Sequence, residues 1–340
     1  MAKIQASMPV YQTIVVIHPA AIGDAVMGTA VARALKKKFP AAKIVYLTHP
    51  SLFPLLELSL AIDVFTEWSR YTALKRLVQQ VRDQNPDLIV DLVGSLRTRL
   101  VSLFSGARVL TFRKQKNRRT WSHLVDNYLA TLEPLDIQPS EQSRPVLTPP
   151  QEFLCEWDHD EDLGRGQEYI ALVPGVGKHR PNRAWPVDCW AQLGEMLLNG
   201  TVAKLALVGG EDDKDTCHAV AAQIGARCVN QAGKMSLVQT AALLSRAKLV
   251  VSADTGPAHI AAAVGKSVIC LMGPTDARRT GPYRMDQIGI SVADRCKCIG
   301  AKHCLRNDGG AAGDCMKTIA VEDVMERVRQ LLAVGTTGGA

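Results

Sequence analysis

The sequence predicts an α/β protein made of two Rossmann-like domains that face each other across a cleft. Short apolar runs typical of strands alternate with amphipathic helical runs along almost the whole chain, which is the pattern of parallel sheets built from βα units. This pattern is interrupted once, at residues 137–166, and then restarts in the same way. A chain of 340 residues is long enough for two domains of about 100–200 residues each.

The first predicted domain covers residues 1–150 and opens with a strand at 13–18 followed by a helix at 21–38. Further elements follow from the spacing of apolar residues. The other strands are expected at 43–47, 88–91 and 108–112, and the other helices at 71–82, 96–104 and 122–132.

Residues 151–166 are predicted to link the two domains, because four prolines lie just before this segment and acidic residues crowd 156–162. The second domain is expected at 167–320, with a C-terminal helix at 321–333. Its strands are predicted at 169–173, 204–208, 249–252 and 267–272, and its helices at 187–198, 213–224, 236–245 and 258–264.

Each half begins with a strand that runs into a turn of small residues, at 18–23 in the first half and at 174–177 in the second. In open α/β sheets such turns stand at the carboxyl ends of the strands, where ligands bind. Neither turn is a complete G-x-G-x-x-G, so a classical NAD site is not supported.

The composition is that of a soluble globular protein, with 47% hydrophobic and 21% charged residues. Apolar runs are far shorter than the roughly 18 residues that span a bilayer. The first residues show no secretory signal pattern. A cytoplasmic location is therefore expected.

Eight basic residues and no acidic one lie between residues 97 and 119, and without them the net charge of +7 would become −1. This patch consists of Arg97, Arg99, Arg108, Arg113, Lys114, Lys116, Arg118 and Arg119. It is expected to face an anionic lipid head group or a phosphorylated saccharide, unless it is only a solvated loop. Nucleic acid is not expected, because only Phe104 and Phe112 interleave the cluster.

Four of the nine cysteines are clustered with the spacing C-x-C-x₅-C-x₁₀-C. They are Cys296, Cys298, Cys304 and Cys315. Four thiols in one loop can converge on zinc or iron, can form a labile cross-link, or can remain free. The spacing is not the C-x₂-C of common zinc ribbons.

The segment from Asp254 to His259 lies between an apolar strand and a predicted helix. Asp254 or Thr255 can cap the helix, and Gly256 allows a ligand to approach the backbone. The free N–H groups and the helix dipole would form a site for a pyrophosphate. The alternative is an ordinary capped helix with His259 on the surface.

Two further carboxylates occupy positions where chemistry is expected. Glu211 follows a strand and can accept both ribose hydroxyls of a nucleotide, or can simply favour a helix start. Asp24 follows Gly23 at the tip of the first turn. In a poorly solvated cleft its pKa would rise toward the range of a general base, whereas the alternative role is stabilisation of a helix N-terminus.

Three segments resemble the ADP-heptose:lipopolysaccharide heptosyltransferases, glycosyltransferase family 9, over roughly residues 12 to 333. They are residues 17–26 with Gly23-Asp24, Trp185-Pro186 after basic residues, and residues 251–263 followed by Gly273-Pro274-Thr275. The sequence departs from the family at His18, where many members have Arg, at Arg183, where Lys is frequent, and in the insert at 178–182.

The resemblance implies the GT-B fold, an ADP-sugar donor and catalysis without a cofactor, in agreement with the lack of an Asp-x-Asp metal pair after a strand. It implies that Asp24 is the base. Residues matching its donor side are Lys178, Arg183, Glu211, Asp254, Thr255, Gly256 and His259, and His18, Arg97, Arg113 and Lys114 are expected on the acceptor side.

The function expected from these observations is lipopolysaccharide biosynthesis, by inverting transfer of a heptose from ADP-heptose to a lipopolysaccharide core or a similar anionic glycan or glycolipid. Peripheral contact with the inner face of the cell membrane would bring the enzyme to such an acceptor. The alternatives are a GT-B nucleotide-sugar epimerase and a non-catalytic saccharide-binding protein of the same fold. Asp24 together with the segment from Asp254 to His259 favours the transferase.

Overall fold

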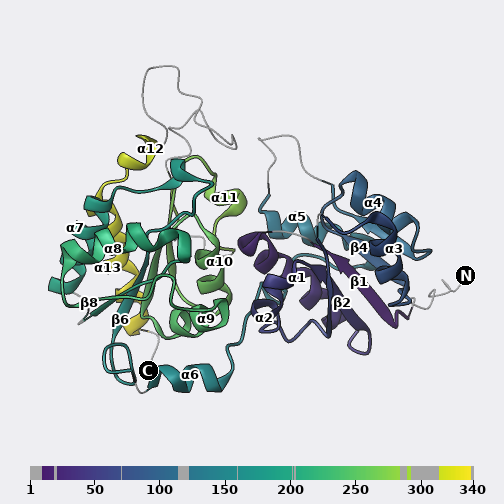
Figure 1. Cartoon of the computed structure of the whole chain (residues 1–340), viewed down its shortest axis with the longest axis horizontal. Helices are drawn as coiled ribbons and strands as arrows, with labels where there is room; N and C mark the ends of the chain where they lie inside the picture. The colour runs from purple at the N-terminus through teal and green to yellow at the C-terminus, as the bar shows by residue number, and fades with distance from the viewer. Residues whose placement is uncertain are drawn as a thin grey trace, which may run out of the picture.

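The computed structural model describes residues 10–18, 21–69, 71–113, 122–158, 160–200, 202, 204–283, 289–291 and 314–337. These residues form two α/β domains side by side, each built around its own parallel sheet (Figure 1). The strand orders are β3-β2-β1-β4-β5 in the first sheet and β11-β10-β9-β6-β7-β8 in the second. The predicted α/β fold is thus confirmed.

The first domain contains five strands and the helices between them. The strands are β1 (Thr13–Ile17), β2 (Lys43–Thr48), β3 (Val64–Glu67), β4 (Leu88–Asp91) and β5 (Arg108–Thr111). The helices are α1 (Ile22–Lys38), α2 (Phe53–Leu56), α3 (Leu74–Arg82), α4 (Leu96–Leu103) and α5 (Leu124–Ala130), with short 3₁₀ turns at Pro50–Leu52, Glu133–Leu135 and Glu141–Ser143. Most residues of β1, β2 and β4 are fully buried, as expected for central strands of a parallel sheet.

The described part of the second domain repeats this arrangement with six strands. They are β6 (Tyr169–Val173), β7 (Lys204–Leu207), β8 (Cys228–Asn230), β9 (Leu249–Ala253), β10 (Val268–Met272) and β11 (Gly289–Ser291). Its helices are α7 (Val187–Gly200), α8 (Lys214–Ile224), α9 (Leu237–Arg246), α10 (Gly256–Ala263), α11 (Ala277–Thr280), α12 (Asp314–Lys317) and α13 (Val321–Thr337), with 3₁₀ turns at Pro181–Arg183 and Glu211–Asp213. The C-terminal helix packs against α7.

The segment between the domains contains a helix that the sequence analysis did not predict, α6 (Gln151–Asp158). It packs against α9 of the second domain (Figure 1). The guanidinium of Arg246 donates to the carbonyl of Leu154 at 2.9 Å. Just before it, the amide of Leu147 donates to Ala263 in the second domain and the amide of Thr148 donates to Leu58 in the first. The crossing between the domains is therefore held by main-chain hydrogen bonds on both sides.

The two domains touch through the amino-terminal turns of α1 and α10. Gly256, the first residue of α10, lies so close to Ile22 that a β-carbon would be 2.9 Å from its Cγ2. Both helices begin directly after a central strand. The contact between the helices therefore brings the carboxyl ends of β1 and β9 near each other, between the two domains. No helix among the described residues is both long enough and apolar enough to cross a membrane.

Candidate active site

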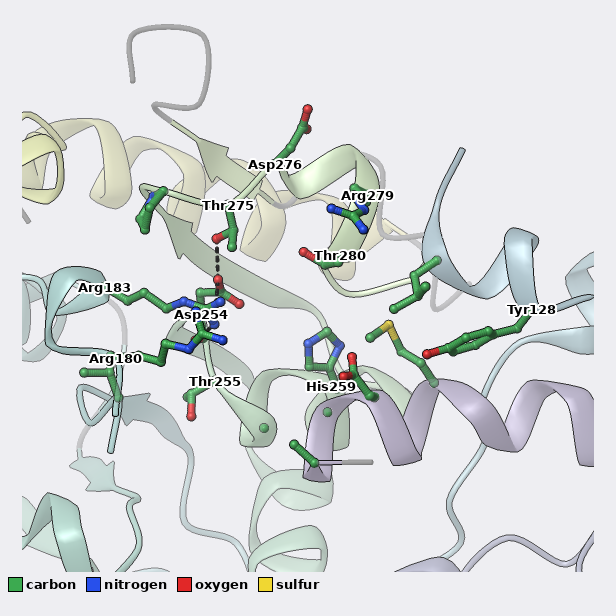
Figure 2. A pocket seen from close by; sticks show the side chains of 18 of the residues that line it. Tyr128, Arg180, Arg183, Asp254, Thr255, His259, Thr275, Asp276, Arg279 and Thr280 are labelled. Atoms are coloured by element: carbon green, nitrogen blue, oxygen red, sulfur yellow. Dashed lines mark hydrogen bonds and ion pairs between the residues drawn. The ribbon is translucent and has the colours of Figure 1, made fainter. Parts of the chain in front are cut away.

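A cavity of about 760 Å³ lies between the two domains, next to the contact of α1 with α10. Its wall on the first domain includes His18, Asp24, Met27, Leu92, Phe112 and Tyr128. Its wall on the second domain includes Arg180, Arg183, Asp254, Thr255, His259 and Arg279. Figure 2 shows Tyr128 of the first domain on one side of the open space and Arg180 and Arg183 of the second domain on the other. One wall carries a carboxylate, and the other carries several guanidinium groups.

Asp24 is half-buried in the first turn of α1 and lines the cavity. In the described part of the chain, no hydrogen bond or ion pair reaches its carboxylate. Burial raises the pKa of this carboxyl above its usual value, and the nearby positive charge of Arg183 opposes part of that rise. The Asp254 carboxylate adds to it. The result is a carboxylate of increased basicity that faces open space, as a general base requires.

The Asp254 carboxylate is held by two partners instead of capping α10. The Nη1 atom of Arg183 lies 3.0 Å from Asp254 Oδ2 and 3.0 Å from the Asp254 carbonyl oxygen. The hydroxyl of Thr275 donates to the same carboxylate (Figure 2). Thr255 occupies the N-cap position in extended conformation, also without a side-chain cap. The expected capping by Asp254 or Thr255 is therefore wrong.

The absence of a cap has a chemical consequence. The amino end of α10 keeps its positive dipole, and among the described residues no hydrogen bond engages the main-chain N–H of Gly256. This end opens on the cavity at Thr255 and Gly256. Arg180 and Arg183 line the cavity beside it. Helix N-termini next to arginines bind phosphate groups well, because N–H donors and positive charge converge on the anion.

His259 is buried, not exposed as a plain capped helix would have it, and it lines the cavity. Burial lowers its pKa to about 4, although the Asp254 charge acts in the opposite direction. The ring is thus neutral at pH 7. Its Nδ1 atom is buried and has no hydrogen-bond partner among the described residues.

Two residues that were assigned to donor binding, Lys178 and Glu211, do not line the cavity. The amino group of Lys178 is exposed and pairs with Asp212 at 2.7 Å. Glu211 pairs with Lys214 at 2.8 Å on the surface. Their donor roles stay predictions, and both side chains would have to leave these partners to fulfil them.

The residues that were assigned to the acceptor side do not lie together in the structure. His18 is buried at the cavity wall. Arg97 is bound within its own domain, where its guanidinium stacks over Trp68 at 5.6 Å and donates to the carbonyl of Thr72. Arg113 is exposed, and Lys114 lies outside the described residues, as do Lys116, Arg118 and Arg119.

The cysteine cluster falls mostly outside the described residues. Cys315 is half-buried, with its sulfur close to Gly273, whereas Cys296, Cys298 and Cys304 are not described. In the described part of the chain, no three His, Cys, Asp or Glu side chains are grouped as metal ligands. A metal at the cluster stays a prediction.

Tyr128, Arg180 and Arg279 are among the polar residues of the cavity wall that were not assigned to the site from the sequence. Arg180 belongs to the insert at 178–182, where the sequence could not tell which basic residue faces inward. Tyr128 comes from α5 and Arg279 from α11, and both reach the cavity only through tertiary packing. No local sequence pattern marks Arg279.

Two facing α/β domains, with a helix N-terminus and a carboxylate on opposite sides of one cavity, fit the GT-B class of glycosyltransferases. The chain belongs to glycosyltransferase family 9 (heptosyltransferase), whose family model matches residues 74–307.

Individual relatives agree with this assignment. The lipooligosaccharide heptosyltransferase 2 of Haemophilus influenzae is 28% identical over 302 residues, which are 79% of this chain and 85% of the relative. The lipopolysaccharide heptosyltransferase 3 of Escherichia coli is 26% identical over 350 residues, covering 93% and 98% of the two chains. The solved structure of E. coli ADP-heptose lps heptosyltransferase II shares the fold with a TM-score of 0.76 at 21% identity, over 96% of this chain and 100% of that one.

Proposed function

We propose that this enzyme transfers a heptose from ADP-heptose to a hydroxyl of a lipopolysaccharide core or a similar anionic glycan, with inversion at the anomeric carbon. The observation that carries the proposal is the position of Asp24. Its unpaired carboxylate, of raised pKa, faces Arg180, Arg183 and the amino end of α10 across one cavity. A base on one wall and a diphosphate site on the other are the two groups that this reaction needs.

The second domain is the proposed donor side. The N–H groups at Thr255 and Gly256 and the guanidinium groups of Arg180 and Arg183 would neutralise the diphosphate. Arg183 is already fixed by Asp254, so its charge needs no rearrangement when the leaving group departs. The neutral ring of His259 offers an imidazole nitrogen to the ADP-heptose without adding positive charge to the site.

The proposed step follows from this arrangement. Asp24 removes the proton of the acceptor hydroxyl while that oxygen forms a bond to the anomeric carbon. The bond from the anomeric carbon to the diphosphate oxygen breaks on the opposite face, and ADP leaves with both electrons of that bond. The negative charge that develops on the diphosphate is met by the arginines and the helix N-terminus.

We further propose that the first domain contacts an anionic membrane surface, where a glycolipid acceptor would be presented. The support is the exposed face of α4 and of the residues that follow it. Leu96, Leu103 and Phe104 are 77%, 70% and 49% exposed. The side chains of Arg99 and Arg113 are exposed close to them in the sequence. Apolar side chains bordered by arginines are typical of surfaces that rest in the head-group region of a bilayer.

The proposed reaction is tested by incubating the protein with ADP-heptose, with and without a lipopolysaccharide-core acceptor, and by following ADP release. Release that depends on the acceptor is the expected result. Isomerised donor without an acceptor would identify an epimerase, and neither release nor isomerisation would identify a binding protein. Either of the last two results would contradict the proposal.

A further inference from the structure

A chain of three buried polar rings runs from the cavity wall of the first domain into the interior of that domain. The Nδ1 atom of His18 is 2.8 Å from the hydroxyl of Tyr46, and its Nε2 atom is 3.2 Å from the hydroxyl of Tyr128. Gly28 makes room for this chain, because a β-carbon there would lie 2.2 Å from His18 Nδ1 and 2.5 Å from the Tyr46 hydroxyl. The three side chains come from the end of β1, from β2 and from α5.

The protons on these three hydrogen-bonded side chains can be placed by matching each hydrogen-bond donor with an acceptor. Burial lowers the pKa of His18 to about 3, so the ring is neutral and has one N–H donor and one acceptor nitrogen. Tyr46 is fully buried, and in the described part of the chain its hydroxyl has no partner except His18. If Nδ1 carried the proton, the hydroxyl proton of Tyr46 would be buried without an acceptor, which is costly.

The arrangement that satisfies every buried group therefore runs in one direction. Tyr46 donates to Nδ1 of His18, and the Nε2–H group of His18 donates to the oxygen of Tyr128. Among the described residues this leaves the hydroxyl proton of Tyr128 without an acceptor, at a side chain that lines the cavity. Figure 2 shows the Tyr128 hydroxyl pointing toward the middle of the cavity. Burial and the charge of Asp24 raise the pKa of Tyr128 well above its usual value, so it stays a donor.

We propose that Tyr46 and His18 fix Tyr128 as a hydrogen-bond donor to a sugar oxygen of the acceptor, holding the acceptor beside Asp24. The acceptor, and not the donor, is the partner because Tyr128 and Asp24 both belong to the first domain, whereas the arginines and the helix N-terminus lie on the second. Phe112 and Leu92 of the first domain line the same cavity. The ring of Phe112 packs edge-on against Tyr128, with centroids 5.1 Å apart, and completes a wall suited to a saccharide. The identity of this ligand rests on the proposed function.

Kinetics of conservative variants test the contact. Tyr128→Phe keeps the ring and removes the donor, so the acceptor KM should rise about 3- to 10-fold while ADP affinity stays unchanged. Tyr46→Phe leaves Tyr128 in place but removes the group that sets the direction of the chain, so a smaller rise is expected. The matched control is Tyr169→Phe, whose buried hydroxyl donates to the Leu243 carbonyl at 2.7 Å in the second domain. It should lower Tm without changing the acceptor KM.

Nitrogen-15 NMR of the histidine rings tests the proton placement without any substrate. His18, assigned by its loss in a His18→Asn variant, should be neutral with its proton on Nε2 between about pH 5 and pH 8. A proton on Nδ1, or an unchanged acceptor KM in a folded Tyr128→Phe variant, would overturn the proposal. If the wild-type protein transfers no heptose, the proposed function fails instead, and the NMR measurement still decides the direction of the chain.

Discussion

The imidazole of His259 lies against the backbone of Gly23 in the other domain, so closely that a β-carbon on Gly23 would be 2.7 Å from its Cδ2 atom. Gly23 precedes the proposed base, Asp24, and His259 belongs to the helix that forms the proposed diphosphate site. The distance between base and donor is therefore set by a direct contact of two elements more than 200 residues apart in the sequence.

Gly23→Ala should disturb this contact. The added methyl group must push the His259 ring or the α1 turn aside, which misplaces Asp24 relative to the donor, so kcat/KM should fall by about 10-fold or more. Gly200→Ala is the matched control, because a β-carbon there meets nothing within 4 Å. Steady-state kinetics of both variants check this, and an unchanged rate for Gly23→Ala would show that the contact does not position the base.

Arg183→Gln should move the acid limb of the kcat/KM profile to higher pH. The charge of Arg183 lowers the pKa of Asp24, and its removal also leaves the negative Asp254 unbalanced, so Asp24 should stay protonated to a higher pH. A shift of up to about one pH unit and weaker ADP binding are expected. In Lys178→Gln, where an exposed surface pair is lost, the limb should not move. Equal pH profiles for Arg183→Gln and the wild type would show that the charge of Arg183 does not lower the pKa of Asp24.

Acid should destabilise the folded protein through its buried histidines. His259 has a folded-state pKa of about 4, below the unfolded value of about 6.5, so only the unfolded state takes up a proton between these values. The contribution of neutral His259 to the free energy of unfolding is complete above about pH 6.5. It is lost as the pH falls toward 4, by up to about 1.4 kcal/mol per pH unit. Urea unfolding at several pH values should show a flatter dependence in His259→Gln, and an identical slope would mean that His259 is not neutral when folded.

Membrane contact should depend on the exposed face of α4. Replacing Leu103 and Phe104 by Ser removes apolar area, and replacing Arg99 and Arg113 by Glu reverses charge, so both changes should weaken sedimentation with anionic vesicles. The charge effect should shrink with added salt, whereas the apolar effect should not. With a soluble acceptor, kcat of the variant with Leu103 and Phe104 replaced by Ser should stay unchanged. Vesicle binding that survives both changes would argue that another surface contacts the membrane.

The sequence was sufficient for most strands, for the longer helices and for the two ends of the site. It did not predict the short strands β3, β8 and β11 or helix α6. The strands before Asp24 and Asp254 are apolar runs, and the carboxyl ends of such parallel strands meet at one edge, so both residues could be assigned to the cleft. Arg279 and Tyr128 reach the cavity through packing of distant elements, which no local periodicity records. The cap expected from Asp254 failed because Arg183 and Thr275 hold its carboxylate. Thr255 occupies the N-cap position but makes no side-chain cap.

The most direct test of the central claim is the rate of Asp24→Asn at saturating ADP-heptose and acceptor. The amide keeps the shape of the side chain but cannot take the proton, so kcat should fall by about 10²- to 10⁴-fold with little change in Tm or ADP affinity. If the variant instead retains more than about a third of the wild-type kcat, a loss far smaller than that of a general base, Asp24 does not remove the acceptor proton.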